Sequence, residues 1–453
     1  VCAPSRSTWI TGMHAISTGT HPMRSRYEIP HDRIQYYPDY LRANGYFVGN
    51  NKKTDFNIGG RVDSDCWDHH GPVDWNVLKQ KQPFFQVINT TKSHESTAFR
   101  DVYNSKHDPQ NTRLRAYHPD VPGMRENYAH YHDAMKRMDA DIGAALAKLE
   151  AMGLADNTIV IHNSDHGGVL PRSKRFLFQS GLHCPLIIRI PEKYKALWPA
   201  DAPGAKVDRL VSFIDMPKTW LSLTGTDVPA HMQGRIFLGQ DTEPEREYHF
   251  AFRGRMDERC ENARAVSDGR YLYIRNYMPY VPWMQHLNYL WRMTATQVWE
   301  AHVRAGNANE VEARFFAAKG WTEELYDMSK DPDSVHNLID NPECSEVTAR
   351  LRVALRGWQE QMVDTGLLPE SEMVRLAEEY NITIYDVARD RSLYNLPALL
   401  DAADLALAKD PDNLPALHNL LSSPDGGLRY WGMVGCFLLD DASVAEAGMQ
   451  DES

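Results

Sequence analysis

The sequence lacks three features, each of which would define a class of protein. No run of apolar residues approaches the roughly 20 that a membrane-spanning helix needs. The six cysteines are scattered without a CxxC or CxxH pair, which argues against a disulfide framework or a structural zinc site and leaves a single disulfide as an alternative. Basic residues are not in excess, and the formal net charge is -12, unlike that of a nucleic-acid-binding surface. We therefore expect no membrane span and no nucleic-acid partner.

What is present is an ordinary globular composition, with 42% hydrophobic and 24% charged residues over 453 positions. A chain of this length is expected to form two or three domains. It opens on Val1 rather than on methionine, with no charged and apolar leader behind it. We expect natural residues upstream of Val1, so the absent leader carries no information about the compartment.

Four short apolar runs in the first half have the length of β-strands and lie at 46–50, 83–89, 158–164 and 184–190. Between the second and third runs, apolar residues recur every three or four positions over 127–153, which predicts a long amphipathic helix. Helices that cover apolar strands are typical of a largely parallel sheet. The pattern predicts an α/β domain over residues 1–235.

The pattern changes in the second half. Residues 263–277 predict a hairpin with its turn at Asp268-Gly269, and helical periodicity returns over 343–364. We expect a smaller α+β domain over 236–370. The segment 371–453 predicts a helical tail, whose Leu- and Ala-rich part is compatible with one or two HEAT-like units.

The residues Cys2-Ala-Pro-Ser-Arg6, followed by Thr11-Gly12, resemble the C-x-P-S-R…T-G signature of the sulfatase family. The resemblance implies that a separate maturation enzyme oxidises Cys2 to formylglycine. One hydroxyl of the hydrated aldehyde would attack sulfur, and the other, once deprotonated, would expel sulfate. Ser5 and Thr8 are suited to opening a helix that faces the sulfate, and Arg6 to holding anions by paired hydrogen bonds. A lone cysteine would instead be a buried, inert residue.

A second motif, Ser164-Asp165-His166-Gly167, directly follows the run at 158–164 and resembles the metal motif of the same family. The resemblance implies that Asp165 and His166 are metal ligands. Such ligands at the carboxyl end of a strand lie where open α/β sheets place their sites. The family's usual ion is calcium, while the histidine leaves magnesium or manganese open. In isolation these residues would predict a plain turn.

A third resemblance concerns Lys174 in the segment 173–191, whose counterpart in the family contacts the sulfate as a compact cation. Gln179 stands where the family has an acid, and Arg172 or Arg175 is the alternative in a shifted register. His183 is a further candidate for binding the substrate. Taken alone, a lysine is usually a solvated surface residue.

Two more segments follow predicted strands. Lys53 corresponds to a family lysine that contacts the nucleophile and the sulfate, but Asp55 stands in place of a family histidine, with Asn51 and Lys52 as possible substitutes. We interpret Asp55 as a substrate-binding residue. His94 corresponds to a histidine that protonates the leaving alcohol or binds the sulfate, and the alternative is an ordinary surface histidine.

The charge-dense segment 253–259 lies in the predicted smaller domain. Arg253 and Asp257 could bind hydroxyls or a carboxylate of a sugar, or could belong to a solvated network of ion pairs.

Together, these resemblances imply an alkaline-phosphatase-like α/β fold and the hydrolysis of sulfate esters, on a sulfated saccharide. A phosphoester or phosphonate monoester hydrolase of the same superfamily is one alternative, and a non-catalytic glycan-binding protein is another. We expect a periplasmic or secreted location. Sulfatases begin with an apolar strand that ends in paired aspartates, so we expect the chain as given, which starts at Val1, to bind metal weakly and to be inactive.

Overall fold

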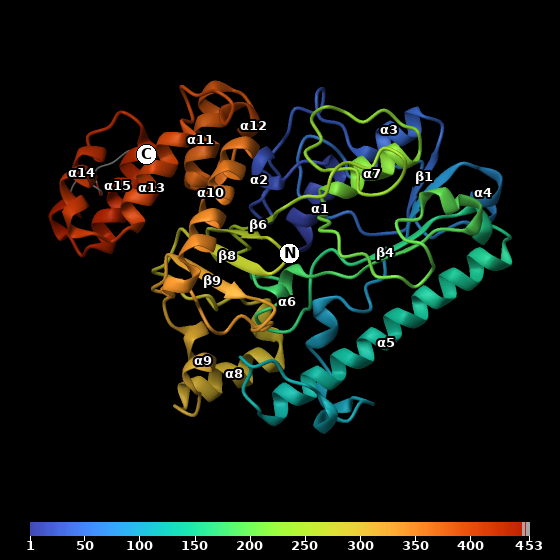
Figure 1. The fold of residues 1–453 in the computed structure, drawn as a ribbon, viewed down its shortest axis with the longest axis horizontal. Coiled ribbons are helices and arrows are strands. Elements are labelled where there is room, and N and C mark those ends of the chain that lie inside the picture. Colours follow the sequence, from blue (N-terminus) through green and yellow to red (C-terminus); the bar gives the residue numbers. More distant parts are fainter. Residues whose placement is uncertain (446–448, 450–453) are drawn as a thin grey trace.

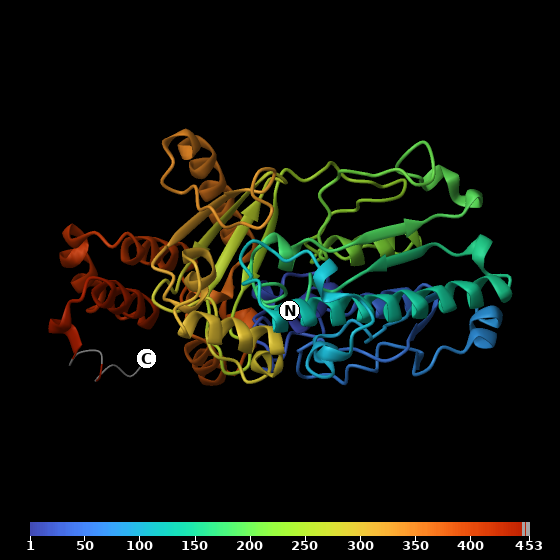
Figure 2. The same ribbon diagram turned by 90° about the horizontal axis from the view of Figure 1, so that it is seen from below.

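The computed structural model describes residues 1–445 and 449, and Figure 1 shows the chain running from the N-terminal half on the right to a helical tail on the left. Two small sheets and the longest helix belong to the right-hand part. A four-stranded sheet lies in the middle, and the N-terminus lies near the centre of both views (Figures 1 and 2).

The first sheet is parallel. It consists of β1 (Phe47–Asn50), β2 (His69–His70) and β3 (Phe84–Val87), with β1 in the middle and parallel to both neighbours. Val48 is fully buried under Tyr37 and Leu41 of α3 (Tyr37–Ala43) and Trp220 of α7 (Asp215–Leu223), which belong to one core cluster. The carboxyl ends of β1 and β3 therefore open toward the same side of the molecule.

The second sheet pairs β4 (Val160–Asn163) with β5 (Leu186–Arg189) in antiparallel fashion. All four predicted strands are present, and this antiparallel pair is the exception within the largely parallel arrangement that the sequence predicted. The connection 164–185 holds only the four-residue α6 (Gln179–Leu182) and returns at the same end of the pair. Without a helix to cross the sheet, the chain comes back in the opposite direction.

The long helix predicted over 127–153 is α5 (Pro122–Ala151). Pro122 stands in its first turn, where a residue without an amide hydrogen costs nothing. The apolar stripe is buried or half-buried throughout, at Tyr131, Met135, Met138, Ile142, Ala145 and Leu149. The other helices of this half are α1 (Cys2–Thr11), α2 (Ala15–Thr18) and α4 (Trp75–Gln80).

The middle sheet is antiparallel, in the order β6 (His249–Arg253), β7 (Ala263–Ser267), β8 (Tyr271–Asn276) and β9 (Glu323–Asp327). β7 and β8 form the predicted hairpin, and Gly269 in its turn adopts a φ of 92° that favours glycine. α10 (Ser345–Met362) packs against the sheet, while α8 (Thr294–Arg304) and α9 (Glu310–Ala313) lie beyond its other side (Figure 1).

The tail is helical as predicted, with its own apolar core around Leu399, Leu417 and Trp431. Its helices are α11 (Glu370–Tyr380), α12 (Ile384–Val387), α13 (Leu396–Leu407), α14 (Leu414–Leu420) and α15 (Gly426–Leu438). Its assignment to HEAT-like units stays a prediction. Within the described residues, no helix is both long and apolar enough to cross a membrane.

A buried arginine ties the first half of the chain to the middle. The guanidinium of Arg172 lies over the rings of Tyr117, Phe178 and Phe315 and donates to the backbone carbonyls of Asp333 and Ser334. Burial lowers its pKa, while nearby tyrosine and glutamate oppose that shift. Arg172 is therefore a structural cation, and the register alternative that placed it in the site is wrong.

Candidate active site

The predicted site residues gather where three strands end. β1 leads into Asn50 and Lys53, β3 leads into Asn89, and β4 leads into Asp165. Helix α1 begins at Cys2 and meets this edge, where its Arg6 contacts Asp165 and Asn89. The N-terminus lies near the centre of Figures 1 and 2. The carboxyl edge of an open α/β sheet is the usual place for a ligand site.

Cys2 is almost fully buried, and its Sγ atom lies 3.2 Å from Nε2 of His166. Sγ marks the place where the oxygens of the modified residue would stand. α1 begins at Cys2 itself, so the expectation that Ser5 or Thr8 opens the helix is wrong. The positive end of the helix dipole is thus directed at Cys2, the predicted source of the nucleophile, where it favours an anion.

Asp165 is the central anion of the site. Arg6 donates from Nε to its Oδ2 over 2.8 Å, and the Lys53 ammonium lies 3.6 Å from the same oxygen. Burial alone would raise the pKa of Asp165, but Arg6, His166 and Lys53 outweigh it and hold that pKa far below the usual range. For His166, burial is the largest effect and lowers the pKa to about 3, so the imidazole is neutral at physiological pH.

Sequence reasoning missed Asn89, which supports Arg6 from behind. Arg6 donates from Nη2 to Asn89 Oδ1 over 3.1 Å, and Asn89 exchanges hydrogen bonds with Asn51. Asn51 is therefore committed to structure rather than to the role of the absent histidine. Nη1 of Arg6 is buried and has no hydrogen-bond partner among the described residues, so it remains available to a ligand.

The donors that these residues offer a metal ion are few. Cys2, Asp165 and His166 bring ligand atoms within 4.8 Å of one another, but Asp165 already carries two cations. Calcium takes roughly six to eight oxygen ligands. Within the described chain, one carboxylate and one imidazole do not complete such a shell, so the residues fit part of a calcium site only.

Lys174 is present at the site but is not free. Its ammonium lies 2.5 Å from Oε2 of Glu95. Arg175 donates to the same carboxylate from both Nη1 and Nη2. Both cations and the carboxylate are buried. The register alternative of Arg175 thus shares an anion with Lys174, and Glu95 was overlooked in the sequence because it directly follows the more conspicuous His94.

The orientation of His94 is set by its own backbone neighbourhood. Its Nδ1 accepts the backbone N–H of Ser96 and lies 2.9 Å from the Ser96 hydroxyl. Because a backbone N–H can only donate, Nδ1 is unprotonated and Nε2 carries the proton. Burial lowers the pKa of His94, and the nearby Lys174 and Lys53 lower it further, so the neutral form prevails. A neutral Nε2–H is a hydrogen-bond donor to sulfate rather than a strong acid.

A charged rim extends outward from Lys53. The Lys53 ammonium lies 3.5 Å from Oδ2 of Asp55. The guanidinium of Arg24 links Asp55 to Asp257, with Nη1 4.0 Å from Oδ1 of Asp55 and Nε 3.0 Å from Oδ1 of Asp257. Arg24, Asp55 and Asp257 all have positive φ angles, 77°, 57° and 49°, which is uncommon for non-glycine residues and concentrates at functional sites. The structure thus brings Asp55 and Asp257 together through Arg24, a residue that no sequence motif indicated.

Two predicted substrate-binding residues lie differently. Arg253 is buried, pairs with Glu261 and donates to the carbonyl of Trp283, so it is a structural residue and its interpretation as a substrate contact is wrong. His183 is exposed, and its Nδ1 lies 3.4 Å from Nε2 of Gln179. Within the described chain, no hydrogen bond or ion pair joins His183 to the Cys2 cluster, so its predicted role has no geometric support.

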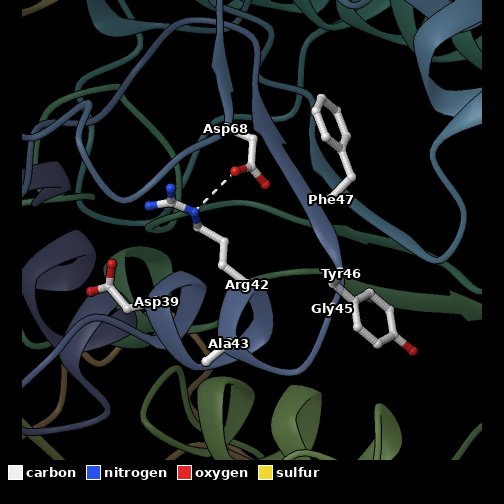
Figure 3. Close-up of a pocket in the computed structure, with 7 residues that line it drawn as sticks. All are labelled: Asp39, Arg42, Ala43, Gly45, Tyr46, Phe47 and Asp68. Atoms are coloured by element: carbon white, nitrogen blue, oxygen red, sulfur yellow. Dashed lines mark hydrogen bonds and ion pairs between the residues drawn. The ribbon is translucent and has the colours of Figure 1, made fainter.

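A surface hollow of about 530 Å³ lies away from this chemistry. It is lined by Arg42 and Asp68, which form an ion pair, and by neighbouring residues of α3 and β1 (Figure 3). None of the residues around Cys2 contributes to it. The hollow therefore does not change the location of the site.

Comparison with known proteins identifies the family. A sulfatase family model matches residues 73–226, and a model for the C-terminal part of N-sulphoglucosamine sulphohydrolase matches residues 171–287. An ulvan-active sulfatase of Formosa agariphila is 33% identical over 422 residues, which cover 83% of this chain and 69% of that protein. The chain belongs to the sulfatase family. This sulfatase is accordingly a sulfuric ester hydrolase, from a family that generally uses formylglycine and a divalent metal.

Solved structures agree on the fold of this sulfatase. A 2-O GAG sulfatase matches with a TM-score of 0.56 at 18% identity, covering 80% of this chain and 82% of its own. A phosphonate monoester hydrolase from Silicibacter pomeroyi matches with a TM-score of 0.55 at 16% identity, covering 80% and 87%. These matches confirm the predicted alkaline-phosphatase-like α/β fold. At such identities they do not distinguish sulfate from phosphonate substrates.

Proposed function

We propose that this sulfatase hydrolyses a sulfate ester on a carbohydrate, with a formylglycine formed from Cys2 as its nucleophile. The observation that carries this proposal is the convergence of Arg6, Lys53 and the His166 imidazole on the Cys2 side chain and on Asp165. A buried cysteine with no function would not need two cations and a helix N-terminus around it. A hydrated aldehyde at this position supplies one hydroxyl for attack on sulfur and a second that releases sulfate.

The cations would bind and orient the sulfate. Arg6 has one unpaired nitrogen, and its position is held by Asp165 and Asn89. Lys53 is the more accessible cation. Burial would lower its pKa, but the neighbouring Cys2 and Asp165 outweigh burial and raise that pKa, so the ammonium stays charged at physiological pH. Arg6 and Lys53 would stabilise the charge that shifts onto sulfate oxygens during transfer.

His94 would act next to them. Its Nε2–H is free of a partner within the described chain, while Nδ1 is held by Ser96. We therefore favour its role as a donor to the sulfate or to the ester oxygen over that of an imidazolium acid.

The rim of Arg24, Asp55 and Asp257 supports a saccharide next to the sulfate. Its two carboxylates and one guanidinium give a net negative charge, which suits donation from sugar hydroxyls and disfavours a second anionic group close by. The ulvan-active relative and the 2-O GAG sulfatase are each named for a sulfated polymer of sugars, which agrees with a saccharide substrate. A maturation enzyme that oxidises Cys2 is the partner that this proposal requires.

The test has two parts. The protein is expressed from its natural gene together with a formylglycine-generating enzyme, and the tryptic peptide that carries Cys2 is weighed by mass spectrometry and labelled with a carbonyl reagent. Hydrolysis of an aryl sulfate and of defined sulfated oligosaccharides is then measured. An enzyme that is active while its Cys2 thiol stays unmodified would exclude the formylglycine mechanism.

A second candidate function is the hydrolysis of phosphonate monoesters, because a phosphonate monoester hydrolase shares the fold. Side-by-side rates with an aryl sulfate, an aryl phosphate and a phenyl phosphonate ester decide between the two. We expect the sulfate to be hydrolysed fastest, because the sulfatase family model and the 33% identical sulfatase both match this chain. The non-catalytic alternative is not retained, since the chain belongs to a family of hydrolases.

A further inference from the structure

We propose that Glu95 is a positioning residue, which fixes the Lys174 ammonium and limits the positive charge at the sulfate position. The proposal rests on the proposed sulfatase function of the same site. Glu95 has no solvent exposure, and its carboxylate receives three charged hydrogen bonds from two cations. No sequence motif assigned it a role.

The geometry shows what the carboxylate holds. Oε1 accepts from Arg175 Nη1 over 2.5 Å, and Oε2 accepts from Arg175 Nη2 over 2.7 Å and lies 2.5 Å from Lys174 Nζ. The two-pronged contact with the planar guanidinium sets the orientation of the carboxylate. The carboxylate in turn sets the position of the ammonium, which otherwise ends a flexible four-carbon chain.

Glu95 is ionised in this arrangement. Burial alone would raise its pKa, but Arg175 and Lys174 outweigh burial and hold the pKa below the ordinary value. One carboxylate then offsets one of two buried cations. Lys174, Arg175 and Glu95 together carry one net positive charge beside the site. Without the carboxylate of Glu95, two positive charges would remain there.

This charge reaches the catalytic residues. The backbone N–H of Lys174 donates to the carbonyl of Gly168, two residues after His166, over 3.0 Å. Its partner Glu95 directly follows His94 in the chain, so the ion pair lies beside both histidines. Among the described residues, Glu95 is the acidic group within ion-pair distance of the Lys174 ammonium. Glu95 therefore acts on the substrate through Lys174, without a need to touch it.

Two consequences separate this role from simple support of the fold. Loss of the fixed ammonium should slow turnover. Loss of the negative charge should also raise the positive potential at the site, so that a dianion such as inorganic sulfate binds more tightly. The combination of slower turnover with stronger product inhibition is not expected from a loosened core.

The experiment uses the protein expressed from its natural gene and matured with the formylglycine-generating enzyme. For Glu95→Gln we expect kcat to fall roughly tenfold to a hundredfold, the effect of one charged hydrogen bond, with KM unchanged or lower. Inhibition by inorganic sulfate should become severalfold stronger. Glu95→Asp, which keeps the charge and shortens the reach, should restore the sulfate inhibition constant and only part of kcat.

The matched control is Asp364→Asn, which removes the charge of another fully buried carboxylate that grips an arginine, Arg264. It should lower stability while leaving KM and sulfate inhibition unchanged. If Glu95→Gln likewise lowered stability and left KM and sulfate inhibition unchanged, Glu95 would be a structural residue and the proposal would be overturned. Wild-type kinetics in Glu95→Asp would also overturn it, and this is the decisive variant where Glu95→Gln does not fold. An unmutated enzyme that hydrolyses no sulfate ester would instead reject the proposed function.

Discussion

Two groups of charges in this sulfatase resemble each other in composition and differ in completeness. In the middle of the molecule, Arg264 and Asp364 are fully buried, and every nitrogen of the guanidinium has an acceptor. At the carboxyl ends of β1 and β4, Arg6 and Lys53 share Asp165, but both cations retain some exposure, and one nitrogen of Arg6 has no partner in the part of the chain that the structure describes. The first group is closed, and the second is open to a ligand.

The physical reason for the difference is the cost of burying charge. A buried charge that lacks a partner is expensive, so a buried ion pair is most stable when hydrogen bonds within the protein satisfy all of its donors and acceptors. Asp364 does so with Arg264, Gln359 and the backbone amide of Gly366. A site that must bind a sulfate keeps cations with unused donors, and the substrate completes them. Cations whose hydrogen-bond donors are not all used are thus informative about function where they face the proposed nucleophile.

The largest effect expected from the open group is the loss of its nucleophile. Cys2→Ala should abolish sulfate ester hydrolysis, because no aldehyde can form, while the circular dichroism spectrum and melting temperature stay near those of the unmodified protein. Activity is measured with an aryl sulfate. Residual turnover above a heat-inactivated control would mean that another residue attacks the sulfur.

The closed group should respond in stability instead. Asp364→Asn leaves Arg264 buried with one neutral partner, and we expect the free energy of unfolding to fall by about 3–5 kcal/mol. Urea titration followed by fluorescence measures this loss. An equal loss in Asp165→Asn would contradict the comparison, since Asp165 is the anion of the open group and lies in a partly exposed cluster.

Lys53 tests the open group by its charge. Lys53→Ala should lower kcat/KM by roughly tenfold to a hundredfold, the value of one charge-assisted contact to sulfate. The control is Lys148→Ala on the exposed face of α5, where we expect no measurable change in kcat/KM. Similar losses at both positions would place the sulfate elsewhere.

The rim should have a smaller and more selective effect. Arg24→Ala frees Asp55 and Asp257 from their shared partner and should raise KM for a sulfated oligosaccharide by roughly two- to tenfold, the range of one ordinary hydrogen bond. KM for a small aryl sulfate, which does not reach the rim, should not change. If both substrates were affected equally, Arg24 would act on the site itself and not on the saccharide.

The smallest expected effect concerns a half-buried link between the first half of the chain and α11. Glu370 accepts from Ser25, Tyr27 and Arg255, and these contacts outweigh burial and lower its pKa to about 2. Its ionised form therefore stabilises the folded state above the ordinary pKa of 4.5, and this contribution is lost as the pH falls from 4.5 toward 2. Glu370→Gln should be less stable than the unmutated protein at pH 7, and the two should converge in acid. A difference in melting temperature that is independent of pH would contradict the assignment.

Local sequence patterns predicted most of the elements that support the site. The four strands, the long helix and the hairpin were confirmed, because each depends on periodicity or turn residues within one segment. The antiparallel direction of β5 relative to β4 was not predicted, because apolar content does not encode the direction in which a chain returns to a sheet.

The site itself divides in the same way. Cys2, Arg6, Lys53 and Asp165 stand in motifs that resemble those of a known family, and the structure brings them together. Arg253 stood in a charge-dense segment that equally suits the interior, and packing placed it there.

By itself, the sequence determined the family, the class of fold and the motif in which Cys2 is the proposed source of the nucleophile, since these depend on short motifs and on periodicity. Only the tertiary structure decided that Glu95 holds Lys174, that Asn89 supports Arg6 and that Arg24 joins Asp55 to Asp257. Partners in these pairs lie 31 to 233 positions apart. Their pairing depends on which loops the sheet edge brings together, and on how much burial each charge can bear, and neither property is contained in a local stretch of sequence.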